Sequence, residues 1–81
     1  MGLRERQHLR RLALSVRSAR KAANLSQVEL AKKLGTTQAG VARLESGRAR
    51  PNVATLLRIA AETGHLLKMQ LHRPASPSAD R

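Results

Sequence analysis

The sequence predicts a mainly α-helical fold in which four helices form one small domain and a single β-strand follows them. Apolar residues recur at helical spacing in four segments, glycines and capping residues separate these segments, and the spacing changes to strict alternation after Gly64. The 81 residues are near the lower size limit for a chain that buries its own core. Because Phe, Trp and Tyr are absent, Leu, Val, Ile and Ala must fill that core, which favours closely packed helices.

The first two helices are bounded by polar residues and a glycine. Apolar side chains recur at helical spacing from about residue 7 to residue 23, and arginine occupies most of the polar positions between them. The stretch "NLSQ" ends this segment. In "SQVE", Ser26 and Glu29 form a capping box that starts the second helix. Gly35 is expected to end that helix, since glycine readily adopts the left-handed backbone of a helix stop.

The third and fourth helices have boundaries of the same kind. Thr37 can cap a helix that starts at Gln38, and Gly47 ends it. The basic loop "RARPN" follows, and its Asn52 can cap a fourth helix over residues 53–63.

The segment after the fourth helix predicts one strand. Leu67, Met69 and Leu71 alternate with polar residues in "HLLKMQLH", which gives a strand with one apolar face. A single strand leaves its edges unpaired, so it must pair with another part of this chain or with a second copy. No other segment has the pattern of a strand. Residues 74–81, "PASPSADR", are expected to be a disordered tail.

The charge balance restricts the partners. Sixteen Lys and Arg against five acids give a net charge of +11, which favours nucleic acid, an anionic membrane or an acidic protein. No apolar run approaches the roughly 18 residues of a membrane span, and no signal peptide is visible, so we expect a cytoplasmic protein without membrane contact.

Cysteine is absent, the three histidines are scattered, and no Ser/His/Asp arrangement occurs. The sequence therefore predicts no metal, no cofactor and no catalytic activity.

Two short helices joined through "LGTT" within a four-helix bundle have the geometry of a helix-turn-helix. Ala31 is small where the second and third helices would cross. Val41 and Leu44 would anchor the third helix to the core, which leaves Gln38 and Arg43 outward with the small residues Ala39 and Ala42. This arrangement would present one polar edge of the third helix to a partner.

The stretch "LSQVELAKKLGTTQAGVARLESGRARPNVATLLRIAAETG" closely resembles the lambda-repressor/Cro-type (XRE) helix-turn-helix family. The motifs "LSQVELA", "LGTTQ", "LESGRARP" and "TLLRIA" occur in order and at the family's spacing, and the match runs from about Leu12 to Gly64. The resemblance implies a lambda-repressor-like DNA-binding domain over residues 1–64, including a basic N-terminal segment. It also implies a two-fold dimer on double-stranded operator DNA, with the third helix in the major groove and half-sites in an inverted repeat roughly 34–36 Å apart.

The resemblance also implies which residues contact DNA. The glutamine matching Gln27 contacts a phosphate, the first residues of the third helix approach base edges, and the loop after that helix follows phosphates. The predicted DNA-contacting residues are therefore Gln27, Thr37, Gln38, Ala39, Arg43, Ser46, Arg48 and Arg50. Gln38 can pair with adenine through two hydrogen bonds, whereas Arg43 faces either bases or backbone.

Two further roles concern the first helix. Arg20 and Glu45 match a family pair that forms an ion bridge between the first and third helices. The other arginines of the first segment are interpreted as a solvated face, from which Arg17 alone reaches a backbone phosphate.

The C-terminal stretch "GHLLKMQLHRP" resembles the strand through which HigA- and HipB-type antitoxins pair with a second subunit. Residues 65–73 are accordingly predicted to be a dimerisation strand that acts through Leu67, Met69 and Leu71.

The predicted function is a sequence-specific repressor, the antitoxin of a toxin–antitoxin operon that represses its own promoter. Two alternatives remain: a module that neutralises a toxin and binds DNA secondarily, and a general RNA or polyanion binder. The lack of aromatic residues disfavours the RNA or polyanion binder, since proteins that bind single-stranded RNA commonly stack its bases on aromatic side chains.

Overall fold

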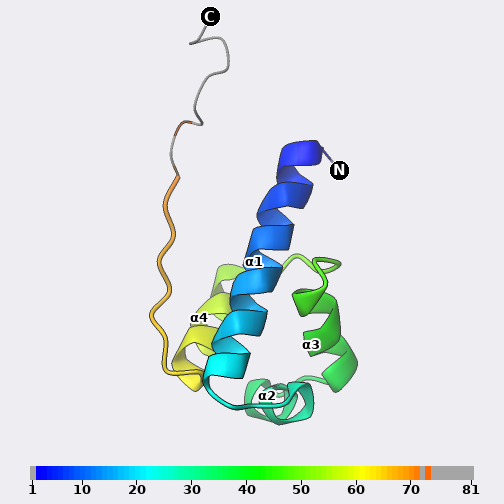
Figure 1. Ribbon diagram of the computed structural model, residues 1–81, viewed down its shortest axis with the longest axis vertical. Helices are drawn as coiled ribbons and strands as arrows, with labels where there is room; N and C mark the ends of the chain where they lie inside the picture. The colour runs from blue at the N-terminus through cyan, green and yellow to red at the C-terminus, as the bar shows by residue number, and fades with distance from the viewer. Residues whose placement is uncertain (1, 72, 74–81) are drawn as a thin grey trace, which may run out of the picture.

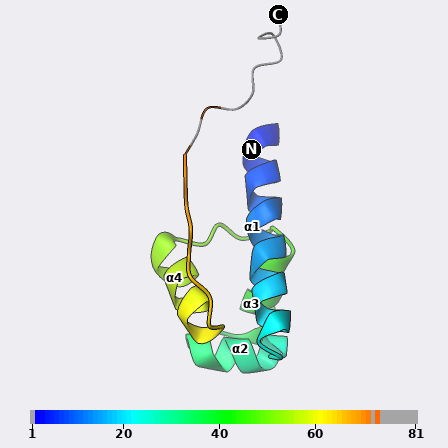
Figure 2. The ribbon, with the colours of Figure 1, turned by 60° about the vertical axis from the view of Figure 1, so that its left-hand side comes forward.

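The computed structural model describes residues 2–71 and residue 73, and its regular structure is helical (Figure 1). The long helix α1 runs through the molecule, α3 and α4 lie on its two sides, and α2 crosses below them. Figure 2 shows the same arrangement from another side. The mainly α-helical, four-helix fold is thus confirmed. The helices are α1 (Leu3–Ala22), α2 (Gln27–Leu34), α3 (Gln38–Glu45) and α4 (Val53–Glu62).

The predicted capping residues begin three of the helices. The Ser26 hydroxyl accepts a hydrogen bond from the Glu29 amide at 3.0 Å, and the Glu29 carboxylate accepts one from the Ser26 amide at 2.7 Å. The bond from the Ser26 amide is the main reason that the pKa of Glu29 is lowered. Thr37 and Asn52 each accept a hydrogen bond from the third amide of the helix they precede. Gly35 ends α2 with φ +72°, a left-handed backbone that glycine adopts without steric cost.

Helix α1 begins earlier than the predicted start near Gln7, because it extends back to Leu3. The prediction followed the apolar spacing, and the first buried position in α1 is Leu9. The four residues before Gln7 are Leu, Arg, Glu and Arg, which all have good helix propensity. The helix therefore continues past the part of it that packs on the core.

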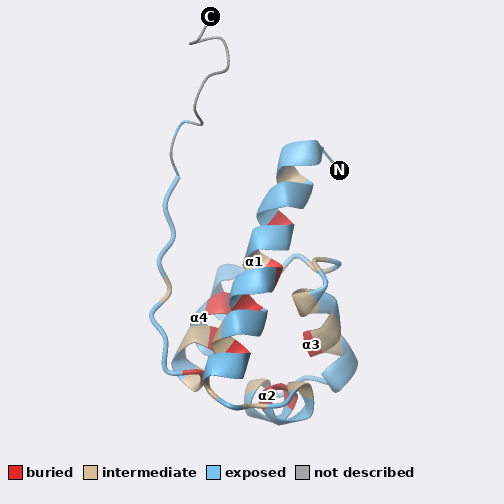
Figure 3. Ribbon diagram, in the orientation of Figure 1, coloured by how far each residue is buried: buried red, intermediate tan, exposed pale blue. Residues whose placement is uncertain are grey.

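The core consists of two adjoining aliphatic clusters, and Figure 3 shows that the buried positions face the inside of the bundle. The cluster between α1 and α4 contains Val16, Leu56 and Ile59, and the cluster between α2 and α3 contains Leu30, Ala31 and Val41. Leu34 of α2 packs against both clusters. The helix-turn-helix unit, α2 and α3, is thereby attached firmly to α1 and α4.

Residues 65–71 follow α4 and contain neither helix nor hydrogen-bonded strand. They leave the end of α4 and run back toward the end of the molecule where α1 begins (Figures 1 and 2). A strand needs a partner along its edge, and none lies within the described part of the chain. The dimerisation strand stays a prediction, and the tail over residues 74–81 lies outside the described residues.

Candidate nucleic-acid interface

The first turn of α3 is at the surface. Thr37, Gln38 and Ala39, the predicted base-contacting residues, are all exposed, as is Arg43 one turn later. On the opposite side of α3, Val41 is fully buried. The helix is thus fixed by one face, and its other face is free to approach a partner.

A chain of polar side chains connects α1 to the exposed edge of α3. Arg20 donates to both carboxylate oxygens of Glu45, from Nε at 2.6 Å and from Nη2 at 3.0 Å. Gln27 Nε2 donates to Glu45 Oε1 at 3.1 Å, and Gln38 Nε2 donates to Gln27 Oε1 at 2.6 Å. The predicted ion-pair residues and two predicted DNA-contacting residues therefore form one continuous network.

The inner end of this network is buried and ionised. The side chains of Arg20 and Glu45 are only 11% and 4% exposed. Burial opposes ionisation of Glu45, but hydrogen bonds from Arg20 and Gln27, together with the charges of Arg20 and Arg17, outweigh it and lower the pKa of Glu45. The hydrogen bond to Glu45 raises the pKa of Arg20. Glu45 therefore acts as a structural anion within a strongly basic protein.

The outer end of the network sets the hydrogen-bonding groups that Gln38 can offer. One N–H of its amide is used by Gln27, which leaves one N–H and the carbonyl oxygen. Adenine presents one acceptor, N7, and one donor, the N6 amino group, in the major groove. The remaining groups of Gln38 match that pair, and its bond to Gln27 limits the rotation of the amide.

An open concavity of about 310 Å³ lies where α1, α2 and α3 meet. Arg17, Gln27 and Ser46 line it, with the Arg20–Glu45 pair and Ala42 completing the lining. Arg20 and Glu45 neutralise each other, so the lining offers the cation of Arg17 and the second N–H of the Gln27 amide, and a phosphate oxygen can accept hydrogen bonds from both. Arg17, the residue of the first segment that was expected to reach a phosphate, thus lies beside Gln27, for which the same contact was expected.

The loop after α3 has contacts that the sequence did not reveal. Arg48 and Arg50 are exposed, and Arg50 Nη2 lies 2.8 Å from Glu5 Oε2 on α1. Ser46 donates its hydroxyl to the carbonyl oxygen of Arg43 at 3.1 Å, so a phosphate contact through this hydroxyl requires that bond to break. The loop thus lies beside the first turns of α1.

The presence of glycine at position 40, in the middle of α3, has a steric explanation that is not visible in the sequence. A Cβ atom on Gly40 would lie 2.8 Å from Thr36 Oγ1 and 3.4 Å from Thr37 Oγ1. The first distance is well inside van der Waals contact. Gly40 therefore lets the turn pack closely against the start of α3.

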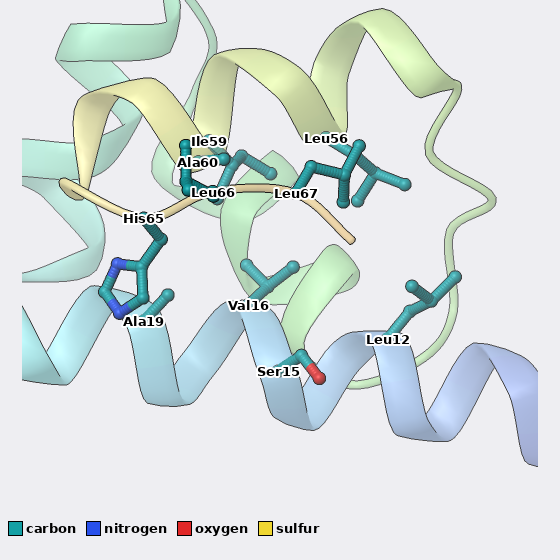
Figure 4. Close-up of a pocket in the computed structure, with 10 residues that line it drawn as sticks. All are labelled: Leu12, Ser15, Val16, Ala19, Leu56, Ile59, Ala60, His65, Leu66 and Leu67. Atoms are coloured by element: carbon teal, nitrogen blue, oxygen red, sulfur yellow. The ribbon is translucent and has the colours of Figure 1, made fainter. Parts of the chain in front are cut away.

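The predicted dimerisation residues fall into two environments. Leu67 is half-buried and packs against the cluster of Val16, Leu56 and Ile59. Residues 65–67 here border a cavity of about 150 Å³ between α1 and α4 (Figure 4). Met69 and Leu71, in contrast, are 58% and 102% exposed. Only these two are available to a partner without a rearrangement.

Two other kinds of site are absent from the described residues. No group of three His, Cys, Asp or Glu side chains is placed to hold a metal ion there. None of the helices in this part of the chain has both the length and the apolar character needed to cross a membrane.

Comparison with known proteins gives one family. A family model described as helix-turn-helix matches residues 16–64, well over half of the chain, and this range includes α2, the turn, α3 and α4. No curated protein sequence matches the chain.

Proposed function

The chain belongs to the lambda-repressor-like (XRE) helix-turn-helix family and is a DNA-binding transcription regulator, and from this premise we propose that it reads a specific operator sequence as a repressor. Phosphate contacts would supply most of its affinity, which would depend on salt concentration. Contacts from the first turn of α3 would supply discrimination between sequences.

One observation carries this proposal: the polar network that ends at Gln38. An ordinary solvent-exposed glutamine rotates freely in water. Gln38 is instead held by a second glutamine, which is itself held by a buried ion pair. Here Glu45 orients Gln27, and Gln27 orients Gln38, with donor–acceptor distances of 3.1 and 2.6 Å. A pre-oriented amide loses less side-chain entropy when it binds a base, which favours specific readout.

The small side chains of α3 limit direct readout. Ala39 and Ala42 can offer apolar contact to a thymine methyl but no hydrogen bond. Gln38 and Arg43 are the long polar side chains on the exposed edge of this helix. We therefore propose that dimer spacing and DNA shape contribute much of the specificity.

A homodimer on an inverted repeat is the assembly that we propose. The exposed Met69 and Leu71 support the proposal that residues 65–73 form the pairing element. We accordingly divide the chain into a DNA-binding domain over residues 1–64, a dimerisation segment over 65–73 and a tail over 74–81. Two copies of α3 would then lie roughly 34–36 Å apart, one turn of B-DNA.

A toxin-neutralising role is the second candidate, and the same segment supports it. Exposed leucine and methionine side chains in an extended segment are suited to contact with another protein, and a toxin is an alternative to a second copy. Sedimentation of the purified chain separates the two. A stable homodimer favours the repressor with self-pairing, whereas a monomer that becomes stoichiometrically bound to the product of a neighbouring gene favours the toxin-neutralising module with secondary DNA binding.

The proposed function is tested by selecting bound duplexes from a random DNA pool. We expect an enriched inverted repeat with half-sites one helical turn apart. Equal affinity for the selected duplex and for random RNA at physiological salt would instead support a general polyanion binder. Half-sites at a distance incompatible with one helical turn would refute the proposed dimer.

A further inference from the structure

The first three turns of α1 and the loop after α3 form one continuous surface. A Cβ atom on Gly47 would lie 3.7 Å from the Cα atom of Arg10, so the two backbones lie close together there. One and a half turns earlier on α1, Glu5 forms its ion pair with Arg50 at 2.8 Å. Arg6 lies between these two contact points on the helix surface, and about 40° from Arg10 around it.

This surface is strongly basic. Arg6 and Arg10 are exposed, and neither has a carboxylate within 4.0 Å in the described part of the chain. The loop adds the exposed Arg48 and Arg50. Glu5 is the one acid on the surface, and its pair with Arg50 is exposed, 43% and 62% for the two side chains. A phosphate could displace Glu5 from Arg50 at little cost, since exposed ion pairs contribute about 0–1 kcal/mol.

We propose that the N-terminal extension of α1, from Leu3 to Arg10, is a second DNA-contacting element, which binds phosphates of the duplex flanking the operator half-site. We define this flank-binding surface as Arg6, Arg10, Arg48 and Arg50. The inference rests on the proposed function, because it assumes that α3 enters the major groove and that the loop after it follows the backbone.

The extension has the right length for this role. From Leu3 to Arg10, α1 rises about 10 Å at 1.5 Å per residue. This equals about three base pairs of DNA at about 3.4 Å each. The extension can thus add two or three base pairs to the contact made by the loop at each end of the operator.

The chain contains its own matched control. Arg4 and Arg11 are on the same helix and are also exposed, but they lie about 100–160° around it from Arg6 and Arg10. Arg6→Gln/Arg10→Gln and Arg4→Gln/Arg11→Gln therefore remove the same charge from the same helix. Only the first pair removes it from the flank-binding surface. Circular dichroism and thermal unfolding check that both variants retain the helical fold.

The experiment compares two duplexes, one limited to the selected inverted repeat and one with five further base pairs at each end. The full chain should bind the longer duplex more tightly, by close to tenfold for each additional phosphate that it neutralises at about 0.1 M salt. Arg6→Gln/Arg10→Gln should remove most of this gain and leave the part contributed by Arg48 and Arg50, and the slope of log K against log salt should become shallower by about 1 for each phosphate that is no longer neutralised. The Arg4→Gln/Arg11→Gln control should keep both the gain and the slope.

Glu5→Gln provides a test in the opposite direction. It removes a negative charge from the flank-binding surface and frees Arg50, so we expect tighter binding to the longer duplex and little change on the shorter one.

Equal effects of the two arginine pairs, or no gain from flanking DNA, would overturn the inference while leaving the operator function intact. If the selection enriches no sequence, the repressor proposal fails, and the salt slopes of the two arginine variants on an unselected duplex still decide the inference.

Discussion

Replacing Glu45 by glutamine should be among the most damaging single changes in this domain. Glu45 accepts three hydrogen bonds, two from Arg20 and one from Gln27, and its side chain is 4% exposed. The Glu45→Gln variant keeps the shape but leaves the Arg20 charge buried without a counter-ion. Removing one partner of a buried ion pair costs about 3–5 kcal/mol. That is a large part of the roughly 5–15 kcal/mol that stabilises a folded domain.

The double variant Arg20→Met/Glu45→Leu distinguishes two free energies. One is the net stabilisation that the ion pair provides, and the other is the destabilisation caused by leaving one charge buried without its partner. Apolar replacements of similar volume leave no buried charge, so most of the lost stability should return. About 1 kcal/mol should remain missing, because Arg20 Nη1 also donates to the Leu25 carbonyl at 2.8 Å. Urea unfolding followed by far-ultraviolet circular dichroism measures all of these differences.

DNA binding by the double variant tests the link from stability to function. Gln27 loses its acceptor on Glu45 in that protein, so Gln38 loses the support behind its amide. We expect a folded protein whose affinity for random duplexes persists and whose preference for the selected operator falls. The reasoning is refuted if Glu45→Gln unfolds within about 1 kcal/mol of the parent chain, or if the double variant is no more stable than the single one.

Four further changes test other parts of the structure. Gln38→Ala should lower discrimination between operator and scrambled duplex by about 1–3 kcal/mol; an equal fall for every duplex would exclude base readout. Gly40→Ala should not yield the helix-propensity gain of about 1 kcal/mol, because the added Cβ would meet Thr36, and the gain should appear once Thr36→Ala is also present. A full gain from Gly40→Ala alone in urea unfolding would contradict this. Deletion of residues 65–81 should give a monomer in sedimentation with weak operator binding, whereas an intact dimer would place the interface elsewhere. Lastly, the pKa of Glu45 is lower in the folded protein than the ordinary glutamate pKa of about 4.3. The ionised carboxylate therefore contributes stability that is fully present above that ordinary pKa and is lost as the pH falls through the pKa of Glu45 in the folded protein. Acid unfolding below about pH 4 should therefore be less steep in Glu45→Gln, and an unchanged pH profile would assign the effect to other carboxyl groups.

Helix boundaries are the part of this protein that the sequence predicts most directly. Ser26, Thr37 and Asn52 each act within three residues along the chain, so the capping pattern alone identifies where α2, α3 and α4 begin. The start of α1 was predicted too late because apolar spacing reports packing, and the first turns of α1 extend beyond the packed core. The predicted strand, in turn, needs a pairing partner that no local pattern specifies.

The candidate interface depended much more on the tertiary structure. Family motifs pointed to Gln27, Gln38 and Glu45 separately, but only the fold joins them, across 11 and 18 positions of sequence. The contact of Glu5 with Arg50 likewise has no local sequence pattern. Short-range hydrogen bonds from capping residues determine where α2, α3 and α4 begin. The hydrogen bonds and ion pairs of its candidate DNA-binding surface form only once the helices are packed, because they join residues that are far apart in the sequence.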